Sequence, residues 1–293
     1  MVQIPSIGLH TVMCVYMNKK NKYLLFILLM AVAMVATATL GPLFVPKDTN
    51  WNENQLQKLD HYQKFFSFVV TGDNRDSIST FNKLIDEINH ENVLFVVDNG
   101  DLVSNGEQSQ FNLFLQQIKR SNKPLLTTLG NHDLRDGNSL NYQQIFGHPY
   151  YSFIIGDSYF IMLNSGSGER LDTIQIEWLD NQLNKGLDYR YRFVFMHYPL
   201  FDPLGRPADE GHSLGDVQQA KMLNNLFDQY NITMLFCSHI HGYYNGTWGK
   251  TPYIITGGAG APLENSDQEH NFYNYVKVNV TQKGVNYQMI RLS

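Results

Sequence analysis

The stretch PLLTTLGNHD, residues 124–133, ends an apolar run on an amide, an imidazole and a carboxylate. The run itself, PLLTTL at 124–129, has the length and apolar character of a buried strand. In open α/β sheets, ligands bind beyond the carboxyl ends of the strands. A buried strand that opens onto Asn131, His132 and Asp133 therefore predicts that these side chains meet a ligand.

Two earlier strands end in the same way. FFSFVV (65–70) leads into TGDNR, which holds Asp73 and Arg75, and NVLFVV (92–97) leads into DNGD, which ends on Asp101. Apolar residues recur at helical spacing between these runs, at Ile78, Phe81, Ile85 and Ile88, and then at Phe111, Phe114, Leu115 and Ile118. This β-α-β-α-β order predicts parallel strands joined by crossover helices.

The second half of the chain repeats the alternation and then turns to strands. Gly156-Asp157 separates two aromatic-rich runs that predict a hairpin. Helical faces follow at Ile176, Leu179 and Leu183, and at Leu223, Leu226, Phe227 and Tyr230. Further predicted strands cover 192–199, 232–239, 252–258, 271–280 and 285–292. We expect a single α/β domain over residues 61–293, in which two sheets pack together with helices outside.

Histidines follow two of the later strands. FMHYP supplies His197, and CSHIHG supplies His239 and His241. Carboxylate, carboxamide oxygen and neutral imidazole are ligands for divalent transition metals. A single histidine beside an apolar strand is more often structural, but chance polar residues would not gather at strand ends. Convergence of such groups predicts an active site.

The ordered set GD, GD, GNHD, H and HxH resembles the calcineurin-like metallophosphoesterase superfamily, from Phe65 to the C-terminus. The resemblance implies a four-layer αββα fold, a two-sheet β-sandwich flanked by helices. QIEWLDNQL and ITGGAGAPL are similar to the exported branch of the superfamily, which includes relatives of purple acid phosphatases.

The resemblance also implies two divalent ions that share a bridging Asp101. Asp73 and His241 would complete the first site, and Asn131, His197 and His239 would complete the second. The ions would be Mn, Fe or Zn, because this ligand set does not choose among them. They would activate a water that attacks a small phosphorylated substrate, a mono- or diester.

The remaining residues of GNHD would assist the reaction. His132 would protonate the leaving oxygen, and Asp133 would orient and charge that imidazole. Gly130 would let the backbone turn where a Cβ would crowd the site. In the loop after His197, His212 would either line the substrate pocket or be a solvated loop residue.

One position departs from the family pattern. The first motif is usually Asp-x-His, but here it reads Asp73-Asn74-Arg75, and an arginine cannot ligate a metal. Either the first metal site is weak and completed by water, or Arg75 grips phosphate oxygens. An ion pair of Arg75 with Asp76 or Asp98 is the alternative. Ser104 stands where purple acid phosphatases have tyrosine, so no iron-tyrosinate centre is expected.

The N-terminus predicts export. Lys19, Lys20 and Lys22 precede an uncharged apolar run at 23–45, which is either a signal peptide or a membrane anchor. Both alternatives place the domain outside the cytoplasm. Residues 1–22 would then be a cytoplasmic N-terminus; if Met17 is the true first residue, residues 1–16 would be an over-extended start. The polar segment 46–60 would be a linker.

Composition limits the possible partners. The formal net charge is −5, so no basic face for nucleic acid is expected. The two cysteines, Cys14 and Cys237, do not indicate a redox compartment. The alternative to an enzyme is a non-catalytic or single-metal relative that serves as a binding domain. The missing motif histidine favours that alternative, whereas the His132–Asp133 pair opposes it. The oligomeric state stays open.

Overall fold

The structure, a computed structural model, describes residues 50–263 and 269–292. They belong to one compact unit, residues 48–293. The predicted N-terminal segments, 1–22 and 23–45, lie outside the described residues. Within the described ranges, no helix combines the length and apolarity needed to cross a bilayer.

The first sheet contains the three strands that end in the polar motifs. Its order is β11-β10-β1-β2-β3. Its strands are β1 (Phe66–Thr71), β2 (Phe95–Asp98), β3 (Leu125–Thr127), β10 (Asn274–Thr281) and β11 (Gly284–Arg291). β1, β2 and β3 are parallel, joined by crossover helices α4 (Ser79–His90) and α5 (Gln108–Ile118). β10 and β11 extend the sheet in antiparallel order.

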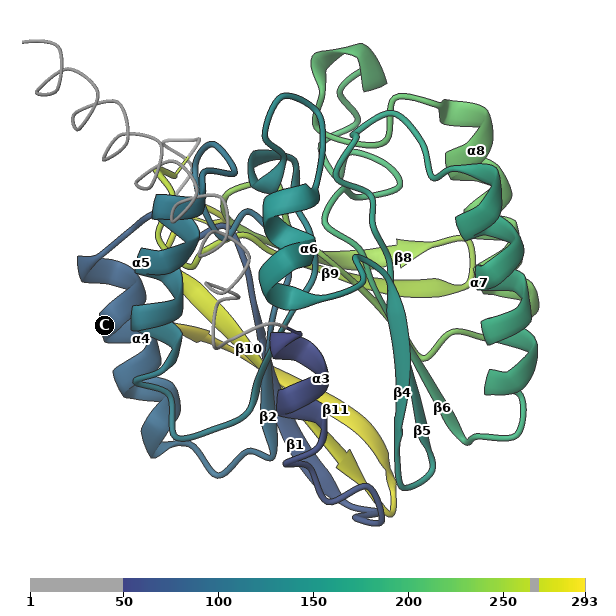
Figure 1. Cartoon of the computed structure of the whole chain (residues 1–293). Helices are drawn as coiled ribbons and strands as arrows, with labels where there is room; N and C mark the ends of the chain where they lie inside the picture. Colours follow the sequence, from purple (N-terminus) through teal and green to yellow (C-terminus); the bar gives the residue numbers. More distant parts are fainter. Residues whose placement is uncertain (1–49, 264–268, 293) are drawn as a thin grey trace, which may run out of the picture. The chain divides into compact units, whose positions relative to one another are not determined.

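The second sheet has the order β4-β5-β6-β7-β9-β8. Its strands are β4 (Tyr151–Ile155), β5 (Ser158–Met162), β6 (Tyr191–Phe195), β7 (Met234–Cys237), β8 (Tyr243–Trp248) and β9 (Thr251–Thr256). The inner strands are parallel, and the edge strands β4 and β8 run antiparallel to their neighbours. Helices α7 (Thr173–Gly186) and α8 (Val217–Gln229) accompany this sheet, whereas α4 and α5 lie beside the other (Figure 1).

An aromatic core joins the two sheets. Phe68 of β1 stacks on Phe95 of β2 with ring centroids 5.0 Å apart, and it forms a T-shaped pair with Phe193 of β6, with centroids 5.4 Å apart. All three rings are fully buried. Truncating such a phenylalanine to alanine typically costs about 3–5 kcal/mol. The four-layer αββα arrangement predicted from the sequence is therefore confirmed.

The segment predicted as a linker is in part a helix of the domain. α3 (Trp51–Leu56) packs on β3, where the indole of Trp51 donates a 2.8 Å hydrogen bond to the carbonyl of Leu125. The amide oxygen of Asn52 accepts a 2.9 Å hydrogen bond from the backbone N–H of Thr127. The linker prediction is therefore wrong for these residues. WNENQL shows no helical periodicity, and its attachment depends on two side chains whose partners are distant in sequence.

Two further elements had no counterpart in the sequence prediction. Helix α6 (Leu140–Phe146) precedes β4, and β8 forms an edge of the second sheet. β8 has four exposed or half-exposed polar and aromatic positions, so hydrophobic alternation cannot identify it.

A buried asparagine ties the carboxyl ends of both sheets together. The Asn99 side chain, just after β2, donates to the carbonyls of Met196 (3.0 Å) and Phe236 (3.3 Å) in the second sheet. Its amide oxygen accepts a 3.0 Å hydrogen bond from the Thr128 hydroxyl. The strand ends that carry the polar motifs are thus held against one another.

Candidate metal centre

The six predicted ligands gather where the strand ends of the two sheets meet. Asp73 follows β1, Asp101 follows β2, Asn131 begins the short 3₁₀ turn η2 (Asn131–Asp133), His197 follows β6, and His239 and His241 follow β7. Two groups have their ligand atoms within 4.8 Å of one another: Asp101, His197 and His239, and Asp73, Asp101 and His241. Asp101 is the member common to both.

Asn131 lies beside the group formed by Asp101, His197 and His239. Its Oδ1 is 3.1 Å from Nε2 of His197 and 3.1 Å from Nδ1 of His239. An amide oxygen between two imidazole nitrogens can share a cation with them, because all three atoms offer lone pairs. The structure thus places Asn131 next to two of the other candidate ligands.

Backbone carbonyls orient all three imidazoles. Nδ1 of His197 donates to the carbonyl of Asn99 (3.0 Å), and Nε2 of His239 donates to that of Gly211 (2.7 Å). Nδ1 of His241 donates to the carbonyl of Pro262 (2.7 Å). In each ring the other nitrogen faces the cluster. Metal-binding histidines are typically held in this way by the nitrogen that does not ligate.

The donor set fits divalent cations. Oδ1 of Asp73 is buried and has no hydrogen-bond partner among the described residues. It lies 3.7 Å from Nε2 of His241 and 3.9 Å from Nε2 of His197. A buried carboxylate oxygen without a donor costs free energy, and a metal ion removes that cost.

The electrostatics of the cluster also call for positive charge. Burial raises the pKa of Asp73 well above its usual range, against the opposing effect of His197. Burial acts to lower the pKa of His197, but the Asp101 carboxylate, 3.3 Å from Nε2, outweighs it and raises this pKa to about 9. Both shifts favour the protonated form, as expected where buried negative charge lacks the cations that bound metal ions would supply.

Three of the candidate ligands have strained backbones. Asp73, Asp101 and His239 adopt positive φ angles of 63°, 57° and 70°. Non-glycine residues seldom occupy this region, and such strain is concentrated at functional sites. The left-handed step turns the chain sharply after each strand and aims the side chain at the cluster.

Contrary to the prediction, the Asp133 carboxylate forms its hydrogen bonds with backbone N–H groups and not with the His132 imidazole. Its Oδ2 accepts hydrogen bonds from the backbone N–H of Asp101 (3.0 Å) and Gly130 (2.8 Å). Its Oδ1 accepts one from Val103 at 3.1 Å. The predicted role of Asp133 in orienting His132 is therefore wrong. Successive side chains of η2 point apart, so this carboxylate holds the loop on which Asp101 lies.

The backbone carbonyl of Ser104 orients the His132 imidazole. Nδ1 of His132 donates a 2.8 Å hydrogen bond to this carbonyl. The other nitrogen, Nε2, lies 4.0 Å from Oδ2 of Asp101, and the imidazole is 31% exposed. His132 therefore reaches both the cluster and solvent, which suits a group that exchanges a proton with a substrate.

Gly130 is required for space. A Cβ there would collide with the backbone nitrogen and Oδ1 of Asp101. Its φ of −101° is ordinary. The predicted crowding is confirmed, but the turn itself needs no unusual backbone conformation.

The backbone of Arg75 is hydrogen-bonded to residues next to the cluster. Its N–H donates to the carbonyl of Asp101 (3.0 Å), and its carbonyl accepts from the hydroxyl of Ser104 (3.2 Å). The residue is half-buried. Within the described part of the chain, no ion pair joins its guanidinium to Asp76 or Asp98; Asp76 instead accepts from Ser104 and Gln110.

Tyr198 is a contact that the sequence did not indicate. Its ring stacks on the imidazole of His239, with centroids 3.8 Å apart and planes inclined by 28°. The half-buried His212 follows Gly211 directly, in the loop that holds His239. In the sequence, the position of Tyr198 next to the predicted ligand His197 is its only signal. A residue that contributes a backbone carbonyl, such as Gly211, leaves no signal in the sequence.

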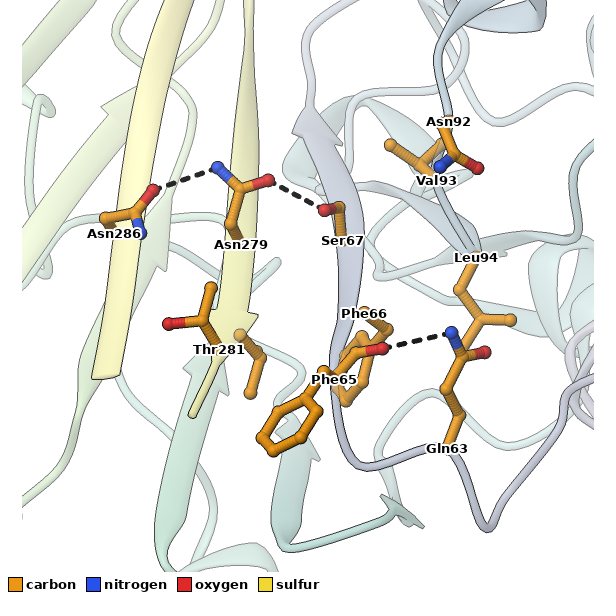
Figure 2. Close-up of a pocket in the computed structure, with 11 residues that line it drawn as sticks. Gln63, Phe65, Phe66, Ser67, Asn92, Val93, Leu94, Asn279, Thr281 and Asn286 are labelled. Atoms are coloured by element: carbon orange, nitrogen blue, oxygen red, sulfur yellow. Dashed lines mark hydrogen bonds between the residues drawn. The ribbon is translucent and has the colours of Figure 1, made fainter. Parts of the chain in front are cut away.

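Two cavities differ in their relation to the cluster. One of about 250 Å³ adjoins it, with Asn131 and His132 in its wall. A larger one, about 550 Å³, lies at the opposite end of β1, where Ser67, Asn279 and Asn286 form a hydrogen-bonded row (Figure 2). It contains none of the candidate ligands, so its size does not make it the site of metal chemistry.

The chain matches a known family. The model of the calcineurin-like phosphoesterases matches residues 66–243. The serine/threonine-protein phosphatase CPPED1 of Rattus norvegicus is 27% identical over 152 residues, which are 48% of this chain and 48% of that protein. The protein named Probable glycerophosphodiester phosphodiesterase GpdQ, from Arcobacter nitrofigilis, is 25% identical over 169 residues, 53% of this chain and 59% of its own. The chain spans about half the length of the curated relatives it matches.

A solved structure shares the fold. The purple acid phosphatase PPD1 from seeds of yellow lupin (Lupinus luteus) aligns with a TM-score of 0.65 at 17% identity. The alignment covers 80% of this chain and 52% of that chain. At this level of identity the likeness bears on the fold alone.

Proposed function

Because this chain belongs to the calcineurin-like phosphoesterase family, we propose that it hydrolyses phosphate mono- or diesters at a binuclear metal centre outside the cytoplasm. The family depends on two metal ions, and the chain has two candidate ligand groups. Asp101 supports this proposal most directly, because it belongs to both groups. Two cations a few ångströms apart need such a shared anion.

The residues of the chain divide the work. Asp73 and His241 would hold the first ion, and Asn131, His197 and His239 the second, with Asp101 between them. Bound divalent ions supply Lewis-acid polarisation of the phosphoryl group and a more acidic water. Their identity, among Mn, Fe and Zn, is left to metal analysis.

His132 would donate the proton that the leaving oxygen needs. Its Nδ1 is committed to the carbonyl of Ser104, so Nε2 is the nitrogen available for transfer. Arg75 would bind non-bridging oxygens of the phosphoryl group, because a guanidinium offers paired donors to such oxygens. His212 would approach the substrate from the loop that contacts His239.

The competing proposal is a binding domain that has lost catalysis. One observation favours it: Arg75 occupies the place of a metal-binding histidine in the family motif. Metal analysis of the purified domain, with assays on nitrophenyl mono- and diesters, separates the two proposals. About two ions per chain with turnover supports the enzyme, whereas one ion or none without turnover supports the binding domain.

We also propose that the domain is exported. The support is the lysine-flanked apolar run at 23–45, which precedes the described residues. A C-terminal tag on the full chain should be degraded by protease added outside the cytoplasmic membrane. A tag protected until the cells are lysed would contradict export. The size of the mature chain distinguishes a cleaved signal from an anchor.

A further inference from the structure

The 250 Å³ cavity beside His132 has walls from three short segments. They are the Ser104–Asn105 turn, the Asn131–His132 pair and residues 134–136. We call it the His132 cavity. Its volume is below the roughly 300–1,000 Å³ of pockets for drug-sized ligands. Apart from Leu134, every lining residue carries a polar side chain.

The cavity lies on the side of the centre where a leaving group would depart. Oδ1 of Asn131 is 3.1 Å from the ligand nitrogens of His197 and His239, so this wall borders the second metal group. His132, in the same wall, would protonate the leaving oxygen. The remainder of that alcohol must then occupy space beside His132.

Charged side chains lie at the solvent side of this cavity, where Arg135 and Asp136 line it and Glu107 pairs with Arg135 next to it. The guanidinium of Arg135 contacts the carboxylate of Glu107 at 2.5 Å and that of Asp136 at 3.4 Å. One positive group between two negative groups leaves an excess of one negative charge. Arg135 is therefore not available as a simple anion receptor.

The backbone around these charges is firmly held. Arg135 and Asn138 exchange two backbone hydrogen bonds of 2.9 and 3.0 Å across a tight turn. Asp136 and Gly137 in that turn have φ angles of 51° and 76°, as the hairpin turns with two positive φ angles require. At the start of α6, just after this turn, the Asn141 side chain donates to the carbonyl of Gly106 (2.8 Å), the residue that follows Asn105.

We infer that the His132 cavity selects esters whose leaving group is a small, neutral, hydroxyl-bearing alcohol, and disfavours leaving groups that carry a carboxylate or a further phosphate. The inference rests on the proposed function and refines its substrate class. Amide and hydroxyl groups in the wall can hydrogen-bond such an alcohol. A leaving group with an additional negative charge would meet the excess charge of Glu107 and Asp136.

Two monoesters that differ chiefly in this charge test the inference. Glycerol 3-phosphate leaves a neutral alcohol, and 3-phosphoglycerate leaves one with a carboxylate. With the metal-loaded full chain, kcat/KM should be roughly three- to tenfold higher for the neutral substrate at low salt, the scale of one partly screened charge. The preference should shrink at 0.5 M salt.

Because the two substrates also differ in intrinsic reactivity, their kcat/KM ratio is compared between the parent chain and charge variants. Asp136→Asn removes one negative charge and should reduce the preference, whereas Arg135→Gln should increase it. Glu177→Gln, on α7 beside the other sheet, changes net charge equally and should leave the preference as in the parent chain. Equal kcat/KM for both substrates, or a preference that neither variant shifts, would overturn the inference. Lack of turnover of nitrophenyl, glycerol and glycerate esters alike by the metal-loaded chain would overturn the proposed function itself.

Discussion

Nε2 of His239 donates a 2.7 Å hydrogen bond to the carbonyl of Gly211, so the loop after β6 determines which nitrogen of this imidazole faces the metal centre. Tyr198 stacks on the same ring. The hydrogen bond and the stacking contact together hold the His239 imidazole in one orientation. The same loop carries His212, so the segment expected to meet substrate also supports a ligand.

The stacking contact predicts a difference between two variants of Tyr198. Tyr198→Leu removes the ring beneath His239 and should weaken metal binding about 10- to 100-fold, the usual effect of losing a group that supports a ligand. Tyr198→Phe keeps the ring and should bind metal as the parent chain does. Titration with Mn²⁺ or Zn²⁺ measures both. Similar loss in the two variants would mean that the hydroxyl, not the stack, matters.

The ligand assignment predicts loss of metal. His239→Ala and Asn131→Ala should each reduce bound metal by about one ion and lower turnover by more than the ~100-fold limit of indirect effects. His148→Ala is the matched control, because His148 contacts the carbonyl of Tyr150 and no candidate ligand. Elemental analysis and kcat check the result. Full metal content in both ligand variants would refute the assignment.

The role of His132 depends on the leaving group. His132→Asn should lower kcat about 10²–10⁴-fold for alkyl phosphates, whose alkoxide needs a proton. Nitrophenyl phosphate should lose much less, because nitrophenolate leaves without one. Metal content should not change. An equal loss for both kinds of ester would argue for a role in binding rather than proton transfer.

Asp133 should matter for stability more than for proton transfer. Asp133→Asn leaves a single acceptor oxygen for the backbone N–H groups of Gly130, Asp101 and Val103. Leaving such buried donors without a partner costs about 1–3 kcal/mol. Urea denaturation of the metal-free chain should show this decrease in the free energy of unfolding. An unchanged free energy of unfolding would show that these three hydrogen bonds do not stabilise the fold.

Arg75 offers the sharpest test of the departure from the family motif. Its main-chain contacts to Asp101 and Ser104 persist in any substitution, so side-chain effects can be isolated. Arg75→Ala should lower kcat/KM roughly 10²–10³-fold with bound metal unchanged, the scale of losing one charge-stabilising donor. Arg75→Lys should recover only part of this, because a point charge cannot make the paired contact.

A histidine at position 75 tests the other account of this site. If the first metal site only lacks a ligand, Arg75→His restores the family motif, and both metal content and activity should rise. Rate and metal content that are unaffected in Arg75→Ala would exclude a role in phosphate binding.

The residue pattern indicated an α/β domain of two sheets and put the six candidate ligands at strand ends, and the resemblance to the calcineurin-like phosphoesterases added the four-layer αββα arrangement and the expected ligand set. Strand ends such as 70–73 and 97–101 can be located because an apolar run stops abruptly at polar residues. Parallel pairing then brings these ends to one edge. Both signals are local in sequence, so no distant contact is needed to read them.

The surroundings of those ligands could be seen only in the folded chain. The carbonyls of Ser104 and Gly211 orient imidazoles, yet every residue has a carbonyl, so sequence cannot single them out. The direction of the Asp133 side chain depends on the turn η2, and the attachment of Trp51 depends on a strand 74 residues away. The sequence shows which side chains could be ligands, whereas the orientation of these side chains depends on backbone geometry that only the folded chain creates.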